Sequence, residues 1–145
     1  MTTSSRSTIR KSIAASLAAN LTSVQQVVDH QASDTGSASP LVRVMSGGSL
    51  RPPSIPAGDD TRFYVIVQTW VLFSEIPGEW TEADAEDALD AVEQEIARWV
   101  DEHQQQPGLW KTLRYSQRSG VRVLEDNGEA WLVEDIVLEV RATDP

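Results

Sequence analysis

Two histidines are the side chains of this 145-residue chain whose ordinary pKa lies nearest neutral pH, which makes them the first candidates for acid–base chemistry. His30 follows Asp29 after a short apolar run, and His103 closes a long acidic segment. A zinc site or an acid–base pair commonly shows a local spacing such as H-E-x-x-H, which the chain lacks. We predict that His103 stabilises a helix C-terminus, where positive charge is favoured.

The other reactive side chains also lack a catalytic arrangement. The acidic pairs at 59–60 and 125–126 lack the loop spacing of a calcium site. No serine occupies a G-x-S-x-G turn, and the glycine-rich stretch 46–49 lacks the lysine of a phosphate-binding loop. The absence of cysteine excludes thiol catalysis, thiolate metal sites and disulfides. The sequence therefore predicts that the protein is not an enzyme and binds neither a cofactor nor a metal.

The chain is strongly acidic, with 12 basic and 22 acidic residues and a formal charge of −10 at pH 7. A field of this sign opposes nucleic acid and anionic membranes as partners. No apolar run is long enough to cross a bilayer. We therefore expect no membrane partner and no specific nucleic-acid binding.

The first 28 residues have the opposite character, because they contain three basic residues and no acidic one. A basic, Ser/Thr-rich start is compatible with an organellar transit peptide or a weak secretory signal. Apolar residues recur every four positions, as in a helix that packs one stripe on a core. The stripe favours a packed first helix over a targeting segment, and it comprises Ile9, Ile13, Leu17 and Leu21.

The segment 81–103 has the clearest helical pattern. Thr81 and Asp84 form a capping-box-like start. A single apolar stripe runs through Leu89, Val92 and Ile96, which we predict to pack on the sheet. The opposite face carries nine acidic residues against one arginine, and it is either solvated or directed at a partner. Our interface candidates on this face are Glu86, Asp90 and Glu93.

Four basic residues lie within twelve positions of the last third of the chain: Lys111, Arg114, Arg118 and Arg122. Such a cluster can contact nucleic acid, line the outer face of a sheet, or complement the acidic helix of a neighbouring copy. The net negative charge favours the third interpretation. Apolar contact would then supply most of the affinity, and the candidate anchors are the tryptophans Trp80, Trp110 and Trp131.

The remaining pattern is that of strands, at 24–28, 41–45, 62–74, 110–117, 121–125 and 130–141. Segment 62–74 is apolar on both faces and is therefore expected at the centre of the sheet. Asp126-Asn127-Gly128 predicts a tight hairpin. The order α-β-β-β-α-β-β-β predicts a single α+β domain, an antiparallel or mixed β-sheet packed against two helices. Residues 1–7 and 142–145 are expected to be a flexible N-terminus and a C-terminal tail.

Segment 47–60 contains three glycines and three prolines. Proline removes hydrogen-bond donors, so we predict an extended arm or loop rather than a strand. Its apolar residues Leu50 and Ile55 are candidate contacts with a neighbouring subunit or partner.

The order and composition of these elements resemble those of the tail terminator (tail completion) proteins of long-tailed bacteriophages. The resemblance spans nearly the whole chain, from the helix beginning Thr8-Ile9-Arg10-Lys11 to the hairpin ending Val137-Leu138-Glu139-Val140-Arg141. The family has no diagnostic motif, and the 47–60 arm departs from its pattern.

The resemblance implies a structural virion protein of the tail or neck, made in the host cytoplasm. Its subunits would form a homo-oligomeric ring, commonly a hexamer, that caps the tail tube and joins it to the head-side connector or stopper protein. The alternatives are another neck, connector or minor tail subunit, a stand-alone cytoplasmic binding protein, and, third, a small hydrolase.

Overall fold

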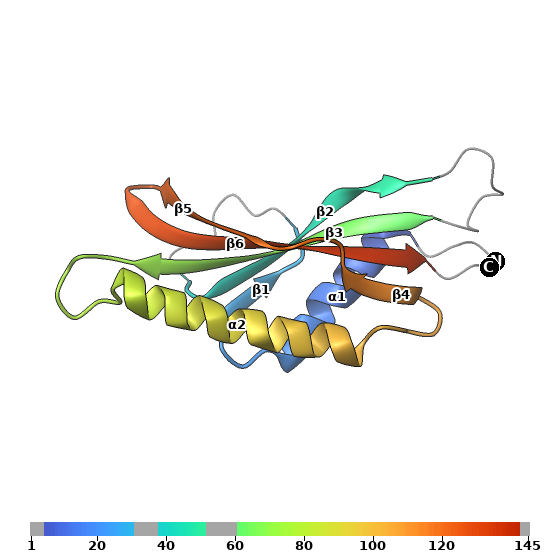
Figure 1. Ribbon diagram of the computed structural model, residues 1–145, viewed down its shortest axis with the longest axis horizontal. Helices are drawn as coiled ribbons and strands as arrows, with labels where there is room; N and C mark the ends of the chain where they lie inside the picture. The colour runs from blue at the N-terminus through green and yellow to red at the C-terminus, as the bar shows by residue number, and fades with distance from the viewer. Residues whose placement is uncertain (1–4, 31–37, 52–60, 143–145) are drawn as a thin grey trace.

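The computed structural model describes residues 5–30, 38–51 and 61–142, which Figure 1 draws as coloured ribbon. Two helices and six strands of this part follow the predicted order α-β-β-β-α-β-β-β, so the α+β class is confirmed. The elements are α1 (Arg6–Asn20), β1 (Gln26–Val28), β2 (Leu41–Leu50), β3 (Arg62–Phe73), α2 (Glu82–Glu102), β4 (Trp110–Tyr115), β5 (Gly120–Asp126) and β6 (Glu129–Ala142).

The six strands of the described part form one mixed sheet in the order β1-β2-β3-β6-β4, with β5 also paired to β6. β1 runs parallel to β2, and the other pairs are antiparallel. β3 lies between β2 and β6, as its apolar faces predicted. β3 pairs with one edge of β6. The other edge of β6 pairs first with β5 and then, further along, with β4.

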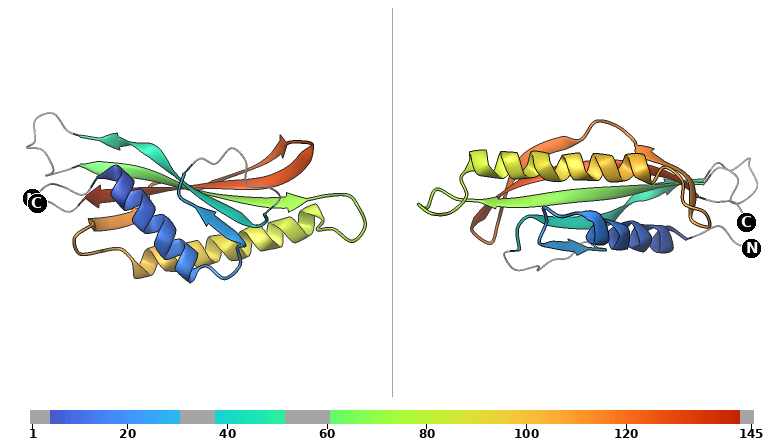
Figure 2. Two further views of the ribbon diagram at one scale, coloured as in Figure 1. Left: turned by 180° about the vertical axis from the view of Figure 1, so that it is seen from behind. Right: turned by 90° about the horizontal axis from the view of Figure 1, so that it is seen from below.

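Both helices cover the same face of the sheet (Figure 2). The predicted stripe of α1 is buried at Ile9, Ile13 and Leu17, and α1 packs beneath β1 and β2. α2 packs beneath β3, β6 and β4. The main hydrophobic core lies between these two layers, which is the predicted packing of a sheet on two helices.

α2 begins with the predicted capping box. The Thr81 hydroxyl accepts a hydrogen bond from the Asp84 backbone N–H at 3.2 Å, and the Asp84 carboxylate accepts one from the Thr81 N–H at 2.9 Å. These bonds satisfy backbone donors that have no partner within the helix. Leu89, Val92 and Ile96 are buried, as their spacing predicted.

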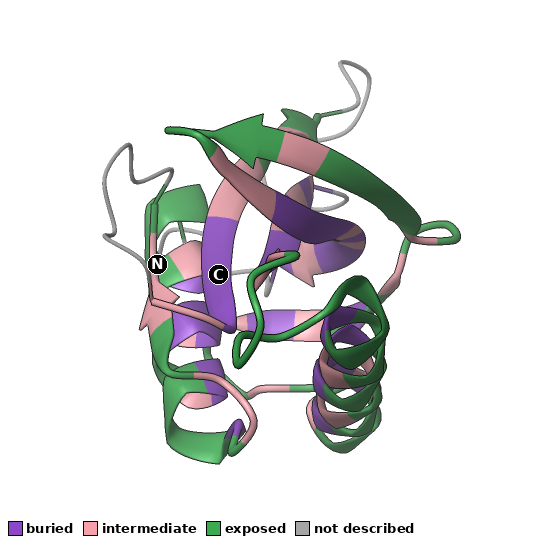
Figure 3. Cartoon of the chain, turned by 90° about the vertical axis from the view of Figure 1, so that its left-hand side faces the viewer, coloured by how far each residue is buried: buried purple, intermediate pink, exposed green. Residues whose placement is uncertain are grey.

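The opposite face of the sheet has its own, smaller apolar cluster. Trp70 and Trp131 meet edge to face with ring centroids 5.7 Å apart, and Leu41 and Val133 are buried with them. Figure 3 shows the sheet curling towards this face, and Leu72 of β3 and Leu124 of β5 pack against the cluster. β3 is therefore buried on both faces over residues 67–71, although the two helices of the described part lie on only one.

The prediction for segment 47–60 is wrong over its first four residues, because Gly47 and Leu50 both belong to β2. The register passes from Ser46 opposite Val65 to Ser49 opposite Phe63, so β2 carries one extra residue in a β-bulge. Gly48 takes φ +106°, a conformation that glycine adopts without strain. The glycines therefore extend the strand rather than end it. Ile55 and the prolines lie outside the described residues.

Both predicted terminal boundaries are also corrected. The Ser5 hydroxyl caps α1 by accepting a hydrogen bond from the Thr8 N–H, so residues 5–7 belong to the cap and first turn of the helix. At the other end Ala142 is buried and pairs with Trp110 as the last residue of β6. The start of α1 follows from a local serine cap, whereas the end of β6 depends on pairing with a strand distant in sequence.

Candidate functional site

The acidic face of α2 is partly open and partly used for structure. Glu86 and Asp90 are exposed, as expected of an interface candidate. Glu93 is half-buried and accepts a hydrogen bond from the Tyr115 hydroxyl of β4 at 3.1 Å. This hydrogen bond connects the helix to the sheet. Glu93 is therefore less accessible than we expected of an interface candidate.

Glu95 on the same helix has a structural role that sequence reasoning missed. One of its carboxylate oxygens accepts hydrogen bonds from the Thr22 and Ser23 backbone N–H groups at 2.7 and 3.3 Å. Partial burial opposes ionisation, but these hydrogen bonds outweigh it and lower the pKa of Glu95. The ionised carboxylate therefore connects α2 to the segment between α1 and β1.

The four basic residues of the last third do not form one free cluster. The Arg114 guanidinium pairs with Glu139 of β6 at 3.1 Å, and Arg122 pairs with Asp135 of the same strand. Their partners lie within the chain, which weakens the prediction that they meet the acidic helix of a neighbour.

The other two basic residues of that set occupy separate places. Lys111 lines a depression with Asp101 and Glu102 at the C-terminal end of α2. Arg118 is exposed beside a different depression, on the sheet face away from the helices. Adjacency in sequence therefore did not produce one basic patch.

The three candidate tryptophan anchors have different environments. Trp110 is only 3% exposed, and its indole N–H donates to the His103 carbonyl at 2.8 Å. Trp131 is buried in the cluster on the far face of the sheet. Trp80 is 46% exposed. The structure thus corrects Trp110 and Trp131 to core positions and leaves Trp80 as the accessible anchor.

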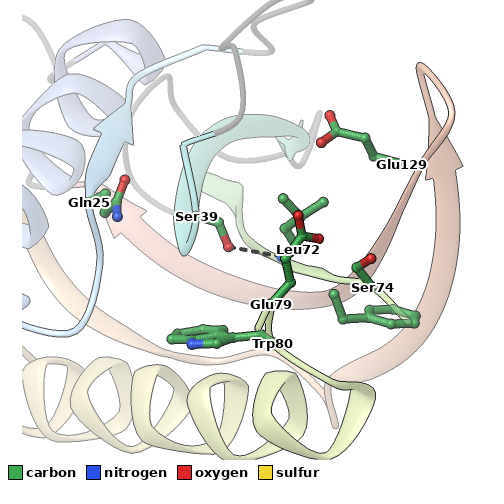
Figure 4. Close-up of a pocket in the computed structure, with 8 residues that line it drawn as sticks. Gln25, Ser39, Leu72, Ser74, Glu79, Trp80 and Glu129 are labelled. Carbon is green, nitrogen blue, oxygen red and sulfur yellow. Dashed lines mark hydrogen bonds between the residues drawn. The ribbon is translucent and has the colours of Figure 1, made fainter. Parts of the chain in front are cut away.

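Trp80 lines an open depression of about 380 Å³ beyond the end of β3 (Figure 4). The loop that carries it is closed by a hydrogen bond from the Ser74 N–H to the Trp80 carbonyl at 2.8 Å. Ser39 lies across the depression, and its hydroxyl accepts from the Leu72 N–H at 2.9 Å. Glu79 and Glu129 add negative charge. The depression thus offers an exposed indole beside carboxylates, which suits a partner with apolar and basic groups.

A polar network lies on the sheet face away from the helices. The Trp70 indole N–H donates to the Gln68 side-chain oxygen at 2.6 Å, and the Gln68 amide donates to Asp135 at 2.7 Å. Arg122 pairs with the same carboxylate, and the Arg43 guanidinium stacks on Trp70 at 4.4 Å. Gln68 interrupts the apolar run of β3 because this network requires a buried amide.

Glu134 is a carboxylate that the fold buries beside other acids. It accepts a hydrogen bond from the Ser119 hydroxyl at 2.6 Å. Burial raises the pKa of Glu134, and the charges of Glu93, Asp90 and Asp135 raise it further. The folded protein therefore binds the Glu134 proton more tightly than the unfolded chain does.

We expect Glu134→Gln to stabilise the protein at neutral and higher pH. The contribution of Glu134 to stability falls as pH rises from the ordinary glutamate range towards its raised pKa, and glutamine removes the charge while keeping an acceptor for Ser119. The gain in melting temperature should thus be larger at about pH 8 than at about pH 4. Glu125→Gln, at an exposed position of β5, is the control for net charge. A lower melting temperature for Glu134→Gln at the higher pH would contradict this expectation.

Both histidines make local contacts. The His103 ring donates through Nδ1 to the Trp99 carbonyl at 2.7 Å and stacks on the Trp99 indole, with centroids 4.6 Å apart. The His30 ring bonds the neighbouring Asp29 carboxylate at 2.9 Å. His103 is the C-cap of α2, which is the role that we predicted.

Among the described residues, no group of three or more histidine or acidic side chains is arranged to hold a metal ion. Within the same part of the chain, neither helix is long and apolar enough to span a membrane.

A basic corner that the sequence did not predict forms where α1 meets β2. Arg10 donates to the Ser46 hydroxyl at 3.1 Å, and Arg6 donates to the Ser49 hydroxyl at 3.0 Å. Lys11 is exposed on the same helix, and Arg51 continues from the end of β2 with its guanidinium over the Phe63 ring. Arg6, Arg10 and Lys11 are close in sequence, but only the fold brings them to β2 and Arg51, and we call this place the α1–β2 corner.

No family model matches this chain, and no curated protein matches it either.

Proposed function

We propose that the protein is a structural virion subunit, a tail terminator that forms a ring, caps the tail tube and joins it to the head-side connector or stopper. The proposal combines the resemblance in element order with the surface of the fold. The protein would be made in the host cytoplasm and reside at the neck of the virion.

The observation that carries the proposal is the separation of charge between two ends of the molecule. One end consists of the first half of α2 and the β5–β6 hairpin, and residues 74–97 contain nine acidic side chains and no lysine or arginine. The other end is the α1–β2 corner, with Arg6, Arg10, Lys11 and Arg51 (Figure 1). Opposite charges at opposite ends favour head-to-tail contacts, and repeated head-to-tail contacts that close by rotation make rings.

The excess of negative charge suits a ring through which DNA passes. A wall of net negative charge repels phosphate, so DNA can slide through without being held. The faces above and below the ring would contact the tail tube protein and the head-side protein. The exposed Trp80 and its depression are our proposed anchor for one of these partners, since tryptophan is enriched at interface hot spots.

We expect the purified protein to assemble into closed rings. Six copies of a 16.0 kDa chain would give a mass of 96 kDa by light scattering, and negative-stain electron microscopy should show rings with a central hole. Assembly should weaken between about 0.05 and about 0.5 M NaCl, because exposed charge pairs are screened by salt. A strict monomer at high concentration, also in the presence of tail tubes, would reject the proposal.

A stand-alone binding protein is the second candidate, and the Trp80 depression is the observation that favours it. A binding module of this kind would remain a monomer or dimer at every salt concentration. The same mass measurement therefore separates the two functions.

A further inference from the structure

The outer edges of β5 and of residues 44–50 of β2 have no neighbouring strand within the described part of the chain. β5 pairs on one side with β6, and its other side is an outer edge. β1 pairs with β2 only opposite 41–43, so the outer edge of β2 is unpaired from residue 44 to residue 50. An unpaired edge is a template for another strand.

The β5 edge has an exposed apolar face. Val121 and Val123 are 55% and 52% exposed, opposite Glu134 and Leu132 of β6 in the register. Leu132 packs on α2, so the two valines project from the face that α2 covers, but beyond the reach of the helix. Asp90 of α2 acts electrostatically on Glu134, so negative charge lies close to this apolar strip.

The β2 edge has the complementary character. Leu50 is 45% exposed at the end of the strand, and Arg6 and Arg10 of α1 are bonded to Ser49 and Ser46 of the same strand. Ser46 and Ser49 lie opposite Val65 and Phe63 and so project from the face that the helices cover, whereas Leu50, opposite Arg62, projects from the other face. On the helix face the edge thus offers backbone groups and positive charge. The bulge between Ser46 and Ser49 twists the strand locally, which disfavours indiscriminate pairing with other edges.

The two edges lie at opposite ends of the sheet. β5 pairs with residues 129–135, the first half of β6, whereas Leu50 lies opposite Arg62, whose other neighbour is Arg141 near the end of β6. Figure 1 shows β5 and the free end of β2 on opposite sides of the molecule. A strand added at one edge therefore leaves the other edge open for the next copy.

We infer that β5 of one copy adds to the free 44–50 edge of β2 in the next copy, so that the sheet continues from subunit to subunit. Val121 and Val123 then lie on the same face of the joined sheet as Ser49, and the acidic side of α2 faces the α1–β2 corner. The inference rests on the proposed ring, and it identifies a second copy of this chain as the occupant of both edges.

The chain has no cysteine, so a pair of introduced cysteines reports this contact without background. We would prepare Ser49→Cys, Val123→Cys and the double variant, because both positions are exposed on the helix face of the sheet, and treat each with a short bis-maleimide cross-linker at low salt. The double variant should give a ladder of covalent oligomers on a denaturing gel, ending at the ring number. Each single variant should remain monomeric, because one cysteine meets no second cysteine in a head-to-tail contact.

Ser49→Cys combined with Thr112→Cys is the control. Thr112 is exposed on β4, which follows β5 along the same edge of β6, so a ladder in the control equal to that of the double variant would overturn the inference. A covalent dimer from Val123→Cys alone would also overturn it, because this contact would be symmetric. Circular dichroism and melting temperatures establish that all variants fold.

Light scattering on the unmodified protein separates this inference from the proposed function. An oligomer of several copies that gives no ladder in the double variant overturns the strand pairing and leaves the ring standing. A strict monomer overturns both. A ladder that disappears at high salt supports the electrostatic part of the contact.

As a second measurement, Lys11→Glu should weaken assembly, because Lys11 is exposed at the α1–β2 corner. Each exposed charge pair is worth up to about 1 kcal/mol, so the loss of one pair should raise the dissociation constant by up to roughly fivefold. Charge reversal at Arg118, outside the proposed contact, is the control. Equal weakening by both changes would contradict the orientation that we propose.

Discussion

Replacing Ile96 by alanine should destabilise the fold by about 2–5 kcal/mol. Ile96 is fully buried in the main core, where α2 faces the sheet, and the smaller side chain would leave a cavity that the packed neighbours fill only in part. Denaturant unfolding followed by circular dichroism measures the change in the free energy of unfolding.

Gln94→Ala is the control for Ile96→Ala, because Gln94 is exposed on the same helix. We expect this change to alter stability by less than about 0.5 kcal/mol. An equally small loss for Ile96→Ala would mean that α2 does not pack on the sheet in solution. The orientation of the acidic face of α2 towards solvent would then also be wrong.

Replacing Trp110 by alanine should cost about 3–5 kcal/mol of stability. The indole is buried beneath the start of β4, and its N–H bonds the carbonyl of His103, the C-cap of α2. Truncation therefore removes core packing and leaves a carbonyl at the end of the helix without its donor. Thermal and denaturant unfolding measure this loss directly.

Trp80→Ala is the matched comparison, since it removes the same side chain from an exposed loop. We expect it to change the free energy of unfolding by less than about 1 kcal/mol. Under the proposed function, its effect should instead appear as weaker binding to the tail tube or head-side protein. A large loss of stability in Trp80→Ala together with a small one in Trp110→Ala would reverse our assignment of core and surface tryptophans.

Periodicity predicted the helices and the central strand because each depends on neighbours in sequence. The four-residue spacing of Ile9, Ile13 and Leu17 predicted the buried face of α1. Asn127 and Gly128 take positive φ at the hairpin between β5 and β6, as their residue types indicated. These features follow from backbone preference and from the apolar side of one element.

The strand β2 shows where local composition fails. Two adjacent glycines ordinarily indicate a loop, and here they form a bulge because β3 continues to pair with the backbone beyond them. Pairing with a strand distant in sequence outweighed local preference, and the sequence contains no signal for it.

The candidate surfaces depended on the fold even more strongly. The spacing of Arg114 and Arg122 indicated a basic patch. The long strand β6 instead places Glu139 beside Arg114 and Asp135 beside Arg122, so both arginines form ion pairs within the chain. Conversely, Arg6 and Arg51 come from distant segments to the same corner, since α1 packs beneath β2.

The sequence by itself determined the element order, the acidic character, the capping of α2 and the absence of cysteine, since these are properties of composition or of short-range contacts. Only the tertiary structure decided which tryptophan is exposed, which charges are already paired and which sheet edges are free. Each of these depends on strand register and on the curl of the sheet, which join residues far apart in the chain through hydrogen bonds and packing that no local pattern encodes.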